Sequence, residues 1–198
     1  DTVPNPNWGQ AATKVAIVRL SPFSDVEESL THGALFSRLR QDLPEAWLDF
    51  AFFPSRRDQS LLAKNGLNWP RAIISGHPLA DFDVILVSIS YVLEAVNLMP
   101  LLDASRIPVY AEQRSMDHPL IVLGGSSALI SHGLMPVVDA FFFGEFEASA
   151  SRLAGLICSY RQARLPGREW CRSLGASVHG LWVPGQPEAE VAKIKRGT

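Results

Sequence analysis

The sequence predicts an α/β domain with a doubly wound, mostly parallel sheet. Short apolar runs rich in β-branched residues alternate along the chain with segments whose apolar residues recur at helical spacing. Several of these runs, residues 83–90 above all, are apolar without alternation, which is typical of central parallel strands buried on both faces. About five such strands favour a flavodoxin-like order, in which the first and third strands flank the switch point where ligands bind.

The predicted elements follow one another in this alternating order. Strands are expected over residues 14–20, 47–53, 83–90, 120–123, 139–143 and 178–183, the last of them at an edge of the sheet. Helices are expected over residues 26–40, 58–65 and 91–102 and along the apolar stripe of residues 153–160. Residues 107–110 are expected to be extended, and residues 166–177 to be a connection.

Local signals mark the ends of several helices. Asp25 is a candidate N-cap, because its carboxylate can accept hydrogen bonds from first-turn amides, and Glu28 holds the capping-box position. Pro44 is expected to end that helix, and Gly66 to end the next one. Pro100 is expected to kink or end the third helix.

The organisation into segments follows from composition. Residues 1–13 contain several proline and asparagine residues and predict an irregular arm. Residues 14–184 are expected to form the α/β domain, and residues 185–198 a linker. No leader-like segment precedes the first strand, so the protein is expected to be cytoplasmic.

Composition and charge exclude several classes of protein. Apolar residues make up 47% of the chain and charged residues 19%, which argues against disorder. The net charge of −2 provides no global electrostatic reason to bind nucleic acid. The apolar runs are far shorter than the roughly 20 residues that span a bilayer. Two cysteines are too few for a disulfide framework or for a cysteine-based metal site.

The candidate site comprises the residues at the carboxyl ends of the predicted strands. They are Ser21, Ser88, Ser90, Tyr91, Gly124, Gly125, Ser126, Gly144, Glu145 and Glu147. Paired glycines directly after a buried strand let the backbone approach a ligand closely, and serines offer short hydroxyls and exposed amides. The alternative is that Gly124 and Gly125 only make a tight turn between a strand and a helix.

Familiar nucleotide and phosphate sites do not match these loops. The dinucleotide fingerprint G-x-G-x-x-G and the P-loop sequence G-x-x-x-x-G-K-[ST] are both absent. A flavodoxin phosphate loop is disfavoured because Asp25, Glu27 and Glu28 would repel a phosphate. A receiver domain would carry an aspartate at the end of the third strand, where this chain has Ser88 and Ser90.

Single histidine, cysteine and tryptophan residues are explained more simply by packing or surface exposure than by a functional role. His32 and His132 could present an imidazole near the cleft, but a partly exposed surface histidine is the simpler interpretation. Cys158 is expected to be a small buried side chain of the last helix. Trp69 and Trp170 are expected to be packing anchors rather than cofactor platforms.

Several segments, taken in order, resemble one family. They are residues 78–85, 88–94, 107–108, 124–125, 140–147 and 180–184. Together they resemble the N-terminal cobalamin-binding-like domain of radical S-adenosylmethionine (radical SAM) enzymes. The resemblance implies that residues 185–198 lead toward a radical SAM barrel, which would be the partner of this domain.

The resemblance implies a cobalamin or a substrate bound at the carboxyl ends of the strands. Ser88 and Ser90 match a serine motif of the family, and Gly124 and Gly125 match paired glycines that would line a nucleotide tail. The chain lacks the D-x-H-x-x-G motif, so any cobalamin would bind without a protein histidine on cobalt. Phe146 replaces a glycine of the family, which could narrow the cleft.

The radical chemistry itself is expected outside this chain. A radical SAM iron–sulfur cluster needs three cysteines in a C-x-x-x-C-x-x-C motif, and the chain has only Cys158 and Cys171. The iron–sulfur cluster and S-adenosylmethionine would therefore belong to the barrel. The expected partners are the barrel and a small-molecule ligand, with no nucleic acid and no membrane. The alternative is a degenerate domain that binds no cofactor and acts as an interdomain or subunit docking module.

Overall fold

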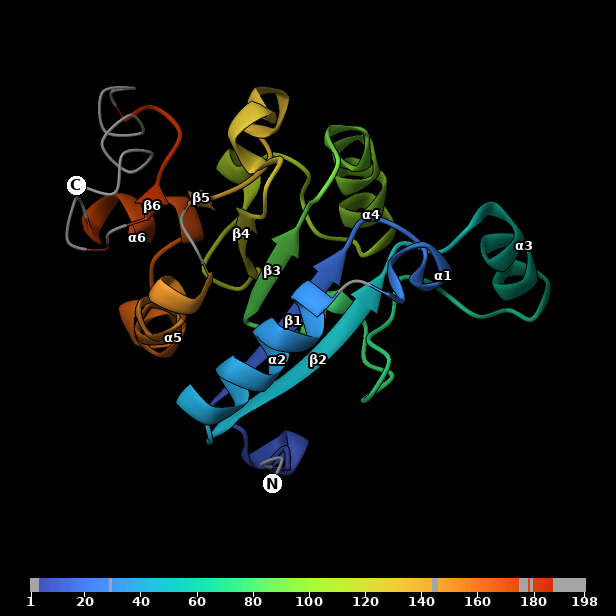
Figure 1. The fold of residues 1–198 in the computed structure, drawn as a ribbon, viewed down its shortest axis with the longest axis horizontal. Coiled ribbons are helices and arrows are strands. Elements are labelled where there is room, and N and C mark those ends of the chain that lie inside the picture. Colours follow the sequence, from blue (N-terminus) through green and yellow to red (C-terminus); the bar gives the residue numbers. More distant parts are fainter. Residues whose placement is uncertain (1–3, 29, 144–145, 175–177, 179, 187–198) are drawn as a thin grey trace.

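A sheet of six strands forms the centre of the molecule (Figure 1). The computed structural model describes residues 4–28, 30–143, 146–174, 178 and 180–186. The strands are β1 (Thr13–Arg19), β2 (Ala46–Phe52), β3 (Val84–Ser88), β4 (Leu120–Gly124), β5 (Ala140–Phe142) and β6 (Leu181–Trp182). Their order is β2-β1-β3-β4-β5-β6, and all neighbours are parallel except β5 and β6. The predicted flavodoxin-like order is confirmed, with β6 added as an antiparallel edge strand.

Helices connect these strands. They are α1 (Phe23–Val26), α2 (Leu30–Asp42), α3 (Arg56–Lys64), α4 (Leu98–Ala104), α5 (Phe146–Ala163) and α6 (Gly167–Leu174). Short 3-10 segments are η1 (Trp8–Gln10), η2 (Leu79–Asp81), η3 (Val92–Asn97), η4 (Ala111–Gln113), η5 (Ala128–Ile130) and η6 (His132–Leu134). Figure 1 shows α3 standing beyond the end of β2, clear of the sheet, and none of its residues is buried.

Alternating residues of the central strands build a separate core on each face of the sheet. Val15 and Ile17 of β1 belong to a cluster that α2 and α5 cover. Ala16 and Val18 belong to a second cluster, in which Leu98 contributes from α4. The strands are apolar without alternation because both faces are covered, as in other parallel sheets.

Several predicted helix boundaries are wrong. In place of one helix over 26–40 the chain forms α1 and then α2, and Asp25 lies inside α1 instead of capping a helix. The helix expected from residue 58 begins at Arg56, and Ser55 caps it, since its hydroxyl accepts a hydrogen bond from the Asp58 amide at 3.2 Å. Pro100 does not end the helix, because it lies in the first turn of α4, where its missing N–H is not needed.

Other expectations are corrected in the later part of the chain. The predicted connection over 166–177 contains α6, whose Trp170 and Cys171 are buried against the sheet. Cys158 is exposed, not buried, because it lies outside the apolar stripe of α5. Residues 107–110 form no strand.

The N-terminal arm is tied to the domain by side-chain contacts. The Asn5 amide donates to the Leu48 carbonyl at 2.8 Å and accepts from the Leu48 amide at 3.0 Å, which satisfies the free edge of β2. Trp8 stacks on His77 with ring centroids 3.9 Å apart. The arm therefore protects an edge strand.

Candidate functional site

The predicted site residues that the structure describes lie at one edge of the sheet, where the parallel strands end; we call it the carboxyl edge. Arg19 at the end of β1 is in register with Ser88, and Ser88 is in register with Gly124. Ser21, Ser90, Tyr91, Gly125 and Ser126 follow directly on the same three strands. Gly144 and Glu145 lie outside the described residues, and Glu147 falls in the first turn of α5.

A buried ion pair occupies the switch point between β1 and β3. Arg19 and Glu94 are 1% and 7% exposed, and a guanidinium nitrogen of Arg19 lies 3.5 Å from Oε1 of Glu94. The same guanidinium donates to the Ser90 hydroxyl at 3.0 Å and lies 3.5 Å from the Ser88 hydroxyl. Nε of Arg19 is buried without a hydrogen-bond partner among the described residues. The serine hydroxyls predicted to face a ligand thus contact a protein charge.

The Glu94 carboxylate is held by three further donors. The Ser21 hydroxyl donates to it at 2.6 Å, and the amides of Ser90 and Tyr91 donate at 2.8 and 3.3 Å. Burial by itself raises the pKa of Glu94, but these hydrogen bonds and the charge of Arg19 outweigh burial and hold the pKa below its usual range. The carboxylate is therefore ionised at neutral pH and fixes the start of η3.

Gly125 is required by the protein backbone itself. Its φ of 104° lies in the region that favours glycine, and a Cβ there would lie 2.2 Å from the Ile89 carbonyl oxygen. A methyl group at this position would therefore meet the protein backbone and not a ligand. A Cβ at Gly124 would similarly lie 3.3 Å from the Phe142 carbonyl oxygen.

Hydrogen bonds join the loops after β3 and β4 to each other. The Ser127 hydroxyl donates to the Ser90 carbonyl at 2.6 Å, and the exposed Ser126 hydroxyl lies 3.4 Å from the same oxygen. The Ile89 amide donates to the Gly124 carbonyl at 3.0 Å, which extends the strand pairing by one residue. These hydrogen bonds hold the two loops together as one unit.

Large apolar side chains are exposed directly beside this unit. Leu93 is 78% exposed, Tyr91 73% and Val96 66%, all within or next to the short segment η3. Phe23 after β1 and Ile130 after β4 are also exposed. We call these five side chains the apolar rim of the carboxyl edge.

His32 lies near the same edge, on the other face of the sheet. Its ring is edge-on to Phe50 and Phe52, and its Nδ1 is buried without a hydrogen-bond partner among the described residues. Burial first, and then the charge of Arg19, lower the pKa of His32. The imidazole is therefore neutral at pH 7. His132 is exposed, as the simpler interpretation expected.

Comparison with known families identifies the chain. A family model described as "Radical SAM proteins, N-terminal" matches residues 33–184, well over half of the sequence. The chain belongs to this family. No curated protein matches the chain. As part of a radical SAM N-terminal domain, the carboxyl edge belongs to an accessory domain of a radical SAM protein.

Two residues of the site in this radical SAM N-terminal domain were missed by sequence reasoning. Arg19 was read only as the last part of a strand, and Glu94 only as part of the family resemblance. A signal was present for Arg19, because a charged residue in an otherwise apolar central strand must find a partner when buried. Its partner could not be found in this way, since Glu94 lies far along the chain.

No group of three or more histidine, cysteine, aspartate or glutamate residues that could hold a metal ion occurs among the described residues. In the same part of the radical SAM N-terminal domain, no helix is long and apolar enough to span a membrane.

Proposed function

We propose that this domain docks through its carboxyl edge onto the catalytic domain of its parent radical SAM protein. The observation that carries the proposal is the apolar rim, above all Tyr91, Leu93 and Val96 in one short exposed segment. Large apolar side chains gathered on a surface are typical of protein–protein contacts, and tyrosine is enriched at the centres of such contacts.

The support beneath the rim is rigid. Glu94 joins the N-terminal end of η3 to Arg19, and the Asn97 amide at its C-terminal end donates to the Leu20 carbonyl at 2.8 Å. Both ends of the exposed segment are thereby tied to the end of β1. A surface held in one conformation loses little conformational entropy on association, which strengthens binding.

The polar groups of the edge favour docking over a deep cofactor cleft. Ser88 and Ser90 contact Arg19, and the Gly125 backbone packs on Ile89. Contacts of these groups with the protein itself support docking over insertion of a nucleotide tail between them. We therefore propose no step of chemistry through cobalamin. The iron–sulfur cluster and S-adenosylmethionine are proposed to belong to the catalytic domain, since this chain has two cysteines.

The test uses the chain and the catalytic domain of its parent protein, expressed as separate polypeptides. We expect the two to associate, and we expect Leu93→Asp to weaken the association by more than tenfold, because it places a charge in the apolar contact. Tyr110→Asp is the matched control, since Tyr110 is 51% exposed but precedes η4, away from the rim. Equal affinities of wild type and Leu93→Asp, measured by calorimetry, would contradict the docking surface.

A second candidate function is the capture of a small ligand, cobalamin or a substrate, at the carboxyl edge of this domain. The favouring observation is that Gly125, Ser126 and Tyr91 are exposed at the carboxyl edge next to the switch point, where sheets of this order bind ligands. The chain is incubated with hydroxocobalamin, desalted and examined by ultraviolet–visible spectroscopy. A retained corrinoid spectrum that Leu93→Asp abolishes would support the second function. A colourless protein supports docking without cobalamin.

A further inference from the structure

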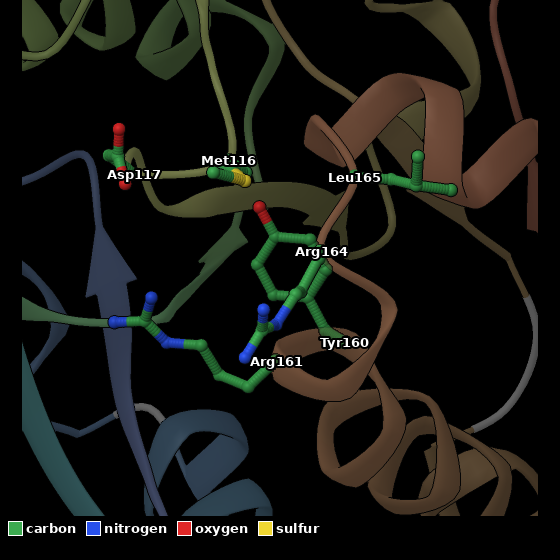
Figure 2. Close-up of a pocket in the computed structure, with 6 residues that line it drawn as sticks. All are labelled: Met116, Asp117, Tyr160, Arg161, Arg164 and Leu165. Atoms are coloured by element: carbon green, nitrogen blue, oxygen red, sulfur yellow. The ribbon is translucent and has the colours of Figure 1, made fainter.

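A small cavity lies at the opposite edge of the sheet, where β3 and β4 begin; we call it the amino edge. Its volume is about 210 Å³, and its lining residues are Met116, Asp117, Tyr160, Arg161, Arg164 and Leu165. Figure 2 shows Tyr160, Arg161 and Arg164 at the end of α5 and Met116 and Asp117 on the loop before β4, with the Arg161 side chain extended away from that of Arg164. The volume is below the 300–1,000 Å³ of drug-sized sites, so it suits a compact ligand.

Arg164 has an unusual backbone conformation. It directly follows α5 with φ 50°, in the left-handed region that helix ends usually fill with glycine. A side chain other than glycine or asparagine is strained there. Its guanidinium forms no hydrogen bond or ion pair with any other described residue. The chain therefore keeps an exposed guanidinium group without a hydrogen-bond or ion-pair partner among the described residues at the cavity, at a position where glycine would be the more stable residue.

The second arginine of the cavity is held in place. Arg161 forms an ion pair with Asp83, which is 4% exposed, and the other oxygen of Asp83 accepts the Lys14 amide at 2.8 Å. The Tyr160 hydroxyl donates to the His118 carbonyl at 3.2 Å. Burial raises the pKa of Tyr160, so this hydroxyl stays protonated. Arg161 and the Tyr160 ring are thus held in place at the cavity, which the Arg164 guanidinium also lines.

The remaining lining sets the class of ligand. Met116 and Leu165 provide an apolar surface beside the arginines, with Met116 51% exposed. Asp117, the single carboxylate in the lining, disfavours a highly charged anion. Guanidinium groups bind the oxygens of carboxylates and phosphates in planar geometry.

We propose that this cavity binds a small organic anion, a carboxylate or phosphate attached to a short apolar body. The oxygens contact Arg164 and the free side of Arg161, and the apolar body lies against Met116 and the Tyr160 ring. This binding is independent of the docking proposed for the carboxyl edge, because the two sites lie at opposite edges of the sheet.

The test records the methyl signals of the three methionines during titration of the chain. Benzoate, phenyl phosphate and inorganic phosphate are the probes. We expect the two aromatic probes to shift the Met116 signal saturably at millimolar concentrations and to leave the Met99 signal, at the carboxyl edge, unchanged. Inorganic phosphate should bind more weakly, since it lacks the apolar body. Benzoate and phenyl phosphate together distinguish carboxylate from phosphate recognition.

Arg164→Gly separates binding from stability. It removes the guanidinium and relieves the backbone strain, so we expect the Met116 shift to be lost while Tm rises by about 2–4 °C. Asp117→Asn should tighten binding a few-fold, because it removes the repelling charge. Arg152→Ala, an exposed arginine of α5 that does not line the cavity, should change nothing. An unchanged Met116 titration in Arg164→Gly, or no saturable shift in wild type, would overturn the proposal.

Discussion

The amino edge of the sheet holds its loops with buried charges, whereas the carboxyl edge exposes apolar side chains around a single described ion pair. At the amino edge, Arg114 lies 3.1 Å from Asp139, and Arg168 donates to the Val138 carbonyl at 2.6 Å. Arg40 donates to the carbonyls of the turn before β2. Buried guanidinium groups thereby satisfy several backbone carbonyls at the amino edge.

The carboxyl edge combines one described ion pair with exposed apolar side chains. Arg19 and Glu94 fix the start of η3, but Tyr91, Leu93 and Val96 beyond it remain exposed. We therefore expect the amino edge to contribute mainly to stability and the carboxyl edge mainly to contact with a partner domain. Substitutions at the first edge should therefore change the free energy of unfolding, and substitutions on the apolar rim should not.

The largest effect is expected for Asp139→Ala at the amino edge. Asp139 is fully buried and accepts from Arg114 and from the Ile121 amide at 2.8 Å. Its loss leaves buried guanidinium charge without a carboxylate, which costs about 3–5 kcal/mol of unfolding free energy. Urea denaturation measures the change, with the exposed Asp117→Ala as control, expected within about 0.5 kcal/mol. Similar losses of unfolding free energy in the two variants would contradict the stabilising role of the buried charges at the amino edge.

Gly125→Ala should be the most damaging change at the carboxyl edge. A Cβ would overlap the Ile89 carbonyl, and alanine is strained at positive φ, so we expect a loss of about 2–4 kcal/mol. Gly133→Ala is the control, because a Cβ there meets nothing within 4 Å. Thermal unfolding of both variants checks the prediction. An unaltered Tm in Gly125→Ala would mean that the Ile89 contact is not required.

Glu94→Gln should have a smaller, pH-dependent effect. At pH 7 we expect a loss of about 1–2 kcal/mol, since charge-assisted hydrogen bonds become neutral ones. The folded-state pKa of Glu94 is lowered, so the wild-type carboxylate adds stability above its unfolded pKa of about 4.3, and this stability is lost as pH falls through the folded pKa. Unfolding curves between pH 7 and pH 3 should show wild type and Glu94→Gln converging at the acidic end. A constant difference in unfolding free energy between the two proteins across this pH range would contradict an ionised Glu94 in the folded state.

The smallest effect on stability is expected for Leu93→Ala. The side chain is 78% exposed, so its truncation should change the unfolding free energy by no more than about 0.5 kcal/mol. Leu39→Ala, at a fully buried leucine of α2, should cost about 2–5 kcal/mol. A large loss of stability in Leu93→Ala would mean that this residue is part of the core, and it would remove the basis of the docking surface.

Part of the site could be predicted from sequence because the carboxyl ends of parallel strands meet at one edge. Ser88, Ser90 and Gly124 were placed correctly at that edge for this reason. Their contacts could not be predicted. The role of Gly125 depends on where the Ile89 backbone lies, and the partner of Arg19 depends on how η3 folds back over β1.

Errors in the helices have similar physical causes. Cys158 sits next to buried Ile157 in sequence, but one residue turns a helix by about 100°, which places the thiol outside the stripe. The short helix α6 begins at a glycine and was expected to be a connection, although packing of Trp170 and Cys171 against the sheet stabilises it. Propensity is a weak guide where tertiary packing supplies most of the helix stability.

The class of fold, the order of the strands and the edge that carries the candidate site could all be predicted from the amino-acid sequence. Those features depend on local periodicity and on general rules of chain connection, which act within a few tens of residues. Three features could be seen only once the chain was folded: Arg19 pairs with Glu94, Gly125 packs on Ile89, and Leu93 stays exposed. These outcomes depend on which distant groups come within a few ångströms of each other, and such proximity leaves no periodic signal in the chain.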